Sequence, residues 1–177
     1  DRQIQGGALT DDEIHTLFLT RKSCVRIVLI SDSCHSGTVT RAAKAEKDAD
    51  SRPRFMPMGN WLPDKLLPKN RAGKVAATMT GPVGTSPLVA AYSNKLSDLL
   101  LSGCKEGPNN FSYDARIKGR FNGAFTHYAL KALKSMKPGA TYADWHKAIT
   151  KYLPSASYPQ SPQLVGSTGA RKGKIFE

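Results

Sequence analysis

The stretch over residues 25–37 constrains the fold more than any other part of the chain. It reads Val-Arg-Ile-Val-Leu-Ile-Ser-Asp-Ser-Cys-His-Ser-Gly, an apolar, β-branched run that stops at a polar turn carrying Cys34. Apolar residues on both faces predict an interior strand covered by helices on each side. A cysteine just past the carboxyl end of such a strand lies where open α/β sheets place their ligands. The chain is therefore predicted to have an α/β fold with Cys34 at the ligand-binding edge of the sheet.

The thiol of Cys34 is predicted to be reactive rather than structural. An unpaired cysteine usually behaves as a small buried hydrophobe. Here the neighbours Asp32, Ser33 and His35 make the surroundings polar, and Gly37 permits a tight backbone turn. Polar, partly exposed surroundings of this kind are typical of reactive cysteines.

The remaining cysteines indicate a reducing compartment. Cys24 and Cys104 bring the number to three, and no two cysteines have Cys-x-x-Cys spacing. An odd number without that spacing argues against a disulfide framework and against a zinc site. We therefore expect a cytoplasmic protein.

The composition is typical of a single globular domain over residues 1–177. Hydrophobic residues make up 40% of the chain, and its length is sufficient for one sizeable core. No apolar run approaches the ~20 residues needed to cross a bilayer, so we expect no membrane partner.

The net charge of +12 raises nucleic-acid binding as an alternative function. The basic residues do not gather on one helix face, and neither aromatic interleaving nor a known nucleic-acid motif accompanies them. We therefore expect no nucleic-acid partner. Nine basic residues lie instead in a Pro-rich middle segment: Arg41, Lys44, Lys47, Arg52, Arg54, Lys65, Lys69, Arg71 and Lys74.

This middle segment, residues 39–87, is predicted to connect two halves of the domain. Six prolines between residues 50 and 87 interrupt regular structure repeatedly. Residues 1–38 would form the half with the nucleophile, and residues 88–177 the second half. Connections of this length in compact domains are usually functional or disordered.

Helices and further strands are predicted on both sides of the connection. Thr10 and Glu13 form a capping box that begins a helix over residues 11–19. A buried strand is expected over residues 99–101, and Thr141 is expected to cap a helix over 142–153. The other expected elements are a helix from the cap Asn122 to 136, a strand over 162–165 and a mobile basic tail from Arg171. The expected core-facing residues of the first and second helices are Ile14, Leu17, Phe18, Phe125, Ala129, Leu130 and Leu133.

The block Asp-Ser-Cys-His-Ser-Gly over residues 32–37 resembles the nucleophile motif of the metacaspases and their prokaryotic relatives, within the caspase-like cysteine peptidases. Four further blocks support the resemblance: Leu-Ser-Gly-Cys at 101–104, Ser-Tyr-Asp-Ala at 112–115, Asn-Gly-Ala-Phe-Thr at 122–126 and Tyr-Pro-Gln-Ser-Pro-Gln-Leu at 158–164. The resemblance implies a three-layer α/β/α caspase-like sandwich with a mixed, mostly parallel sheet, of which this chain lacks the N-terminal strands. It also implies a cysteine endopeptidase with Cys34 as nucleophile.

The catalytic histidine of such an enzyme is not expected in this chain. The base of caspase-like enzymes lies about 50 residues before the cysteine, and counting back from Cys34 runs past Asp1. His35 should point to the opposite face from its neighbour, and no motif surrounds His127 or His146. We therefore expect an N-terminal fragment of the same protein to carry the histidine and to be a partner of this chain.

Asp32 and Asp114 are expected to bind the substrate. Asp32 precedes the nucleophile by two residues, so alternation along the strand places both side chains on one side. A carboxylate there raises the thiol pKa unless a cation neutralises it. In metacaspases the matching acid lies in a pocket for Arg or Lys, and Asp114 is a second candidate for that pocket. The expected partners are peptides or proteins with Arg or Lys before the scissile bond.

The resemblance also makes Ca²⁺ a candidate cofactor, with Asp11 and Asp12 as candidate ligands, because metacaspases use adjacent acids before this helix. Ca²⁺ takes six to eight oxygen ligands, yet Thr-Val-Thr-Arg at 38–41 supplies no further acid. Helix capping explains Asp11 and Asp12 without a metal, so both interpretations stay open.

Two further expectations follow from the absent histidine and the basic connection. A non-catalytic homologue that acts as a scaffold is the alternative within the fold. An active enzyme specific for Arg or Lys would cut itself between Arg41 and Lys74, because exposed tips are preferred sites of cleavage.

Overall fold

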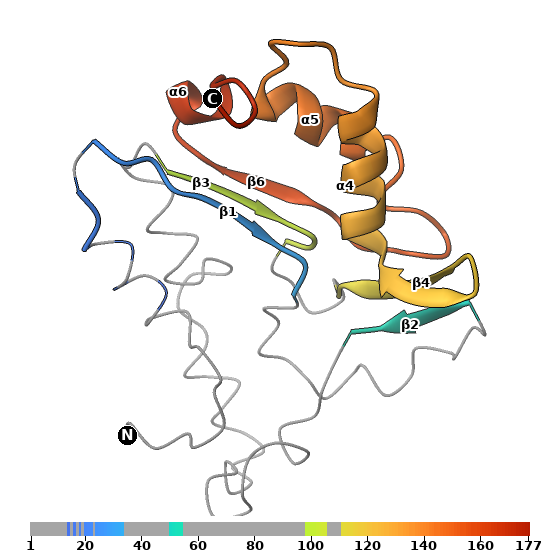
Figure 1. The fold of residues 1–177 in the computed structure, drawn as a ribbon. Coiled ribbons are helices and arrows are strands. Elements are labelled where there is room, and N and C mark those ends of the chain that lie inside the picture. Colours follow the sequence, from blue (N-terminus) through green and yellow to red (C-terminus); the bar gives the residue numbers. More distant parts are fainter. Residues whose placement is uncertain are drawn as a thin grey trace, which may run out of the picture.

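A mixed three-stranded sheet forms the centre of the structure. The computed structural model describes residues 14, 16, 18, 20–22, 24–33, 50–54, 98–105 and 111–177. The sheet has the order β1-β3-β6, with β1 at Val28–Ser31, β3 at Leu99–Ser102 and β6 at Gln163–Gly166. Strand β1 is parallel to β3, and β3 is antiparallel to β6 (Figure 1). The predicted strands at residues 25–30, 99–101 and 162–165 are confirmed to within a few residues.

Three helices lie on one side of this sheet (Figure 1). They are α4 at Ala124–Lys134, α5 at Tyr142–Ile149 and α6 at Thr168–Arg171. The prediction that Thr141 caps α5 is confirmed, because Thr141 and Asp144 form a complete capping box. The cap predicted for α4 is wrong. Gly123 is its N-cap, and the Asn122 amide donates to the Arg120 carbonyl instead.

The leucines of β3 connect the sheet to two separate cores. Leu99 and Leu101 are fully buried in the core that includes α4 and α5. Leu100 points to the other face, where Ile14 and Phe18 pack against it. Residues 14, 16 and 18 are helical, so helical structure lies on both faces of β3. This arrangement agrees with the predicted three-layer α/β/α sandwich and its mixed sheet.

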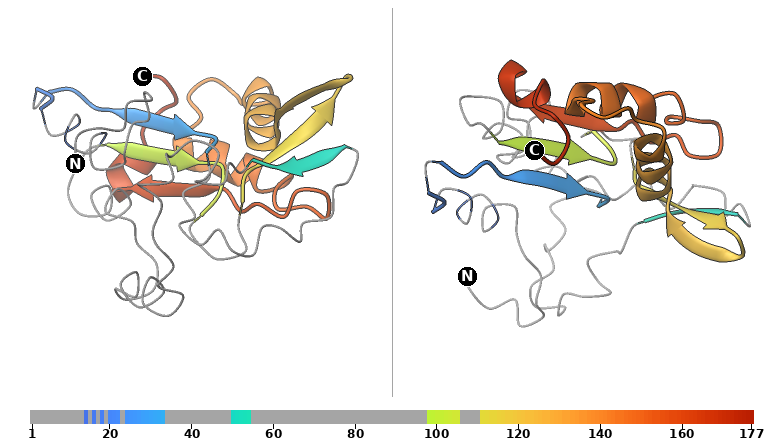
Figure 2. Two further views of the ribbon diagram at one scale, coloured as in Figure 1. Left: turned by 90° about the horizontal axis from the view of Figure 1, so that it is seen from below. Right: turned by 45° about the horizontal axis from the view of Figure 1, so that its top comes forward.

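A second, antiparallel sheet lies beyond the carboxyl ends of β1 and β3 (Figure 2). It consists of β2 at Ser51–Pro53, β4 at Tyr113–Ile117 and β5 at Arg120–Gly123, in the order β2-β4-β5. Lys118 and Gly119 join β4 to β5 with φ angles of 51° and 79°. Two consecutive positive φ angles are typical of the tight turns that close hairpins. Sequence analysis predicted neither this hairpin nor a strand in the Pro-rich connection.

A buried ion pair holds the start of β1 against β3. Asp98 is fully buried, its Oδ1 accepts the Ile27 N–H at 3.0 Å, and its Oδ2 lies 3.1 Å from Arg21 Nη1. Removing one partner of such a pair leaves an uncompensated buried charge. The pair therefore helps to fix the approach of the chain to the site.

Three sequence-based expectations about burial are wrong. Strand β1 is not interior, since Ile30 is 42% exposed and no described strand pairs with the outer edge of β1. Leu130 is 52% exposed because its position on α4 faces away from the sheet. The basic tail is packed rather than mobile: Ala170 is buried, and the Phe176 N–H donates to the Tyr142 hydroxyl at 3.0 Å.

None of the helices in the described residues combines the length and the apolar character that a membrane span requires.

Candidate active site

The three residues before Cys34 have their backbone carbonyls fixed by other parts of the chain. The Ser31 carbonyl accepts the Gly103 N–H at 2.8 Å. The Asp32 carbonyl accepts Arg54 Nη1 at 2.7 Å, and the Ser33 carbonyl accepts the Cys104 thiol at 3.6 Å. The backbone is therefore held at each of the three residues that lead up to Cys34 in the sequence.

The Asp32 carboxylate caps helix α4 from a distant part of the chain. Its Oδ2 accepts the Thr126 N–H at 3.2 Å and the Thr126 hydroxyl at 2.7 Å. The N-cap Gly123 has no side chain to satisfy the free N–H groups at the start of α4. Helix N-termini also favour negative charge. The sequence-predicted pocket residue Asp32 is therefore 90% buried against a helix N-terminus, since its side chain is only 10% exposed.

Two glycines make room for this carboxylate. A Cβ at Gly123 would lie 1.9 Å from Asp32 Oδ2, and a Cβ at Gly103 would lie 3.1 Å from Asp32 Oδ1. Larger residues at these positions would displace the acid. The buried Oδ1 has no hydrogen-bond partner within the described residues. It therefore leaves acceptor capacity unused in the site.

Asp114 lies beside Asp32, and the guanidinium of Arg54 joins them. Arg54 Nε is 2.8 Å from Asp114 Oδ1, and Arg54 Nη1 is 3.4 Å from Asp32 Oδ2. Arg52 Nε contacts the other oxygen of Asp114 at 3.2 Å and stacks on Phe121, with 3.9 Å between the guanidinium carbon and the ring centroid. The structure thus brings together the two acids that sequence analysis assigned to one pocket, with an arginine between them.

A buried glutamine links the elements around the acids. Gln160 is fully buried, its Nε2 donates to the Gly103 carbonyl at 2.9 Å, and its Oε1 accepts the Tyr113 N–H at 2.9 Å. The motif blocks at 101–104, 112–115, 122–126 and 158–164 therefore meet near Asp32. The four blocks were recognised in the sequence, but no role was predicted for Gln160, Thr126 or Arg54. The only signal for Gln160 in the sequence was its position inside the block at 158–164.

Several predicted site residues lie outside the described residues. They are Cys34, Asp11 and Asp12, so their roles stay predictions. Within the described ranges, no three side chains of His, Cys, Asp or Glu gather in a way that could hold a metal ion.

The two described histidines have contacts of their own. His146 Nε2 lies 3.2 Å from the Pro162 carbonyl oxygen. His127 packs edge-on against Tyr128, with 5.0 Å between the ring centroids. Partial burial lowers the pKa of His127, and the positive charges of Lys131 and Lys134 lower it further. These contacts do not test the prediction that the catalytic base lies outside this chain.

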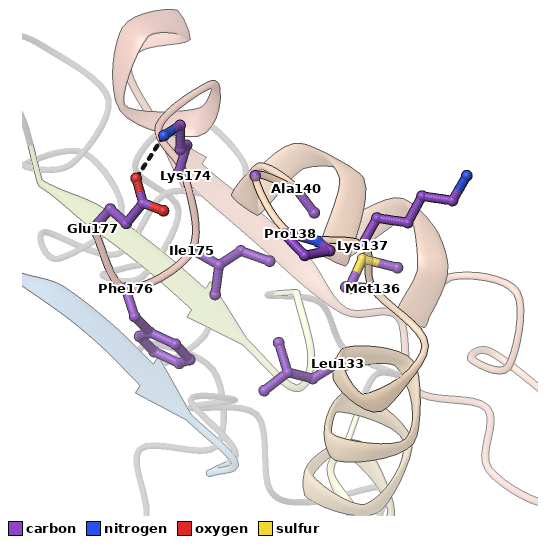
Figure 3. A pocket seen from close by; sticks show the side chains of 10 residues that line it. Leu133, Met136, Lys137, Pro138, Ala140, Lys174, Ile175, Phe176 and Glu177 are labelled. Carbon is purple, nitrogen blue, oxygen red and sulfur yellow. Dashed lines mark hydrogen bonds and ion pairs between the residues drawn. The ribbon is translucent and has the colours of Figure 1, made fainter.

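A surface hollow of about 440 Å³ lies at the carboxyl end of α4 (Figure 3). Asp32 contacts the opposite, amino end of that helix at Thr126. Leu133, Met136 and Ile175 line its apolar side, and an ion pair of 2.7 Å between Lys174 and Glu177 lies at its edge. Helix α4 has 11 residues, which separates its ends by about 16 Å. The hollow is therefore separate from the cluster of Asp32, Asp114 and Arg54.

A family model described as the caspase domain matches residues 3–172 of this chain. Metacaspase-1 of Candida albicans is 28% identical over 91% of this chain, and the match covers 39% of that protein. Metacaspase-1 of Saccharomyces cerevisiae is 29% identical over 91% of this chain and is covered to 40%. The chain thus spans less than half the length of these curated relatives.

A solved structure supports the same grouping at the level of the fold. The crystal structure of a protein from Geobacter sulfurreducens has a TM-score of 0.56 and 29% sequence identity to this chain. The match covers 94% of this chain and 57% of the other protein.

Proposed function

Because the chain belongs to the caspase-domain family of cysteine peptidases, we propose that it is the nucleophile-bearing part of an endopeptidase that cuts after Arg or Lys. The observation that carries this proposal is the pair of carboxylates, Asp32 and Asp114, around the Arg54 guanidinium. Asp32 is two residues before Cys34 in the sequence. A site that holds one arginine with two acids has the charge and the hydrogen-bonding geometry to select another.

Cys34 supplies the nucleophile in the proposed reaction. Its thiolate attacks the carbonyl carbon of the substrate Arg or Lys, and the C–N bond to the next residue breaks. The expelled amine takes a proton from an imidazolium, and water then hydrolyses the thioester to a carboxylate and the free thiol. The imidazole is proposed to come from a histidine in a longer protein, on the N-terminal segment expected from sequence. The Cys34 backbone N–H is a candidate donor to the oxyanion.

Asp32 is proposed to link substrate binding to the state of the thiol. A carboxylate near Cys34 disfavours the thiolate by charge repulsion. The Arg54 guanidinium offsets this charge in the free protein, and a substrate Arg or Lys that takes its place maintains the offset. The proposed pocket therefore keeps the penalty on the thiolate low while the correct residue is bound, whereas a neutral residue in that place would restore it.

The proposal is tested by labelling the full-length protein with an arginyl peptide carrying a thiol-reactive group. We expect an adduct at Cys34, none in Cys34→Ala, and weaker labelling by the matched peptide with uncharged citrulline. Asp32→Ala should reduce arginyl labelling more than labelling by iodoacetamide, because only the first needs the pocket. Absence of any adduct at Cys34 would favour the scaffold alternative instead, and equal losses with both reagents would make Asp32 structural.

Self-processing is proposed within the basic connection, between Arg41 and Lys74. The connection is tethered to the site, which raises its effective concentration there. Mass spectrometry of the active protein beside its Cys34→Ala variant tests this proposal. Equal nicking in both proteins, or nicking at no basic residue, would contradict it.

A further inference from the structure

Strand β2 is held mainly by backbone pairing to β4. It pairs antiparallel with β4 in the register Arg52 to Asp114. The pairing continues at both ends, where the Arg116 N–H donates to the Asp50 carbonyl at 2.8 Å and the Arg54 N–H donates to the Ser112 carbonyl at 2.7 Å. A short extended segment added to a sheet edge through main-chain hydrogen bonds is a common mode of peptide recognition.

Two side chains at β2 reach the acids Asp32 and Asp114, which are called the acid pocket below. Alternation along an extended chain puts Arg52 and Arg54 on the same side, and both contact Asp114. Arg54 extends further to the carboxylate and the carbonyl of Asp32. Residues 51–54 therefore combine backbone pairing to β4 with a guanidinium between the two acids.

The Arg54 side chain does not have the burial of a structural core arginine. It is 40% exposed, whereas the side chains of Asp32 and Asp114 are 10% and 16% exposed. The carboxylate of Asp32 also keeps both hydrogen bonds from Thr126 without Arg54. Ion pairs with an exposed partner are weak individually. Another cation could therefore replace Arg54 without dismantling the acids' own supports.

We propose that residues 51–54 are a built-in ligand of the acid pocket, and that a substrate's Arg or Lys must displace Arg54 in order to bind. The inference rests on the proposed function, because it takes Asp32 and Asp114 as the substrate pocket. Tethering keeps Arg54 at a high effective concentration beside the acids. Arg54 forms one weak ion pair with Asp32 and one with Asp114. Removing both pairs should raise the affinity for a competing cation by about 3- to 30-fold.

Binding of a single-residue probe tests the competition without turnover. The protein is the full-length chain carrying Cys34→Ala, and the probe is N-acetyl-arginine amide. This probe offers a guanidinium to Asp32 and Asp114 but is too short to form a strand along the edge of β4. NMR titration gives its affinity in this background and after the additional change Arg54→Gln. The matched control is Arg116→Gln, which removes an exposed arginine of the same small sheet.

We expect Arg54→Gln to tighten probe binding by about 3- to 30-fold, and Arg116→Gln to leave it within twofold. Arg54→Lys should bind the probe as weakly as the unchanged background, because a cation still fills the pocket. Equal affinities in all four proteins, with the probe still preferred over N-acetyl-citrulline amide, would overturn the inference and leave the Arg/Lys pocket intact. Equal binding of the two probes to the Arg54→Gln protein would instead contradict the proposed function.

Discussion

Substitution of Gly123 by alanine should move the Asp32 carboxylate while leaving the backbone unstrained. Gly123 has φ −58° and ψ 124°, angles that alanine adopts readily. The added methyl group would lie 1.9 Å from Asp32 Oδ2 and 3.0 Å from Arg54 Nη1. The effect of Gly123→Ala is therefore a direct test of how Asp32 is held.

The magnitude follows from the contacts that the displaced carboxylate loses. Asp32 Oδ2 must move by roughly 1.5 Å to reach an ordinary contact distance, which breaks the bonds from the Thr126 N–H and hydroxyl. Hydrogen bonds to charged groups contribute about 1.5–3 kcal/mol each, and overpacking alone costs about 1–3 kcal/mol. Water partly replaces the lost bonds. We expect Gly123→Ala to lower the free energy of unfolding by about 2–4 kcal/mol.

Urea unfolding in two backgrounds provides the assay. In the Asp32→Ala background the clashing oxygen is absent, so Gly123→Ala should cost less than about 0.5 kcal/mol there, a coupling of about 2 kcal/mol or more. Gly169→Ala is the matched control, because the nearest atom to its added methyl group is Ser167 Oγ at 4.0 Å. The same cost for Gly123→Ala in both backgrounds would refute the assigned contact between Gly123 and Asp32.

Three further changes test the fold and the calcium question. Trp145→Phe should lower the free energy of unfolding by about 2–3 kcal/mol, seen as a lower urea midpoint, because it removes a buried hydrogen bond of 2.8 Å to the Ala129 carbonyl; an unchanged midpoint would contradict this. Hydrogen bonds from the Thr141 hydroxyl and backbone lower the pKa of Asp144, so their stabilising effect is present above pH ~4 and is lost as pH falls through the lowered pKa. Thr141→Val should therefore raise that pKa in an NMR titration and show a smaller stability deficit in acid, where only the bond from the Asp144 N–H to the Thr141 hydroxyl still counts; a deficit independent of pH would argue against the assignment. Chelation of Ca²⁺ should reduce peptidase activity only weakly, whereas a complete loss that millimolar Ca²⁺ restores and Asp12→Ala abolishes would show a true site.

Local patterns were sufficient to predict the central sheet and one helix cap. The three consecutive leucines at 99–101 form an apolar run that predicts a buried strand from local sequence alone, and all three are buried in the structure. The reciprocal bonds of Thr141 and Asp144 are separated by three residues, so they depend on local geometry alone. Asp32 and Asp114 were both predicted from the sequence as candidates for one pocket, and both contact Arg54 in the structure; their role in substrate binding stays a prediction.

Features that depend on distant residues were not predicted. Asn122 is a good capping residue by type, but Asp32 supplies the acceptor for the first turn of α4 from 94 residues away. That distant cap makes a side chain at Gly123 unnecessary and sterically excluded. The basic tail was expected to be mobile because charge alone cannot reveal that Ala170 and Ile175 pack against the main core.

The position of Arg54 connects two predictions that were made separately from the sequence, the acidic substrate pocket and self-cleavage in the basic connection. The acids were assigned to a substrate pocket, and the basic connection was assigned to self-cleavage. Local pattern could not relate them, because the pairing of β2 with β4 brings Arg52 beside Asp114 across 62 residues. With Arg54 between the acids, the segment expected to be cut already lies where a substrate residue is proposed to bind. If Asp32 and Asp114 select the residue before the scissile bond as proposed, they favour Arg54 over the other basic residues of the connection. The first fragment in the mass-spectrometric assay of self-processing should accordingly end at Arg54.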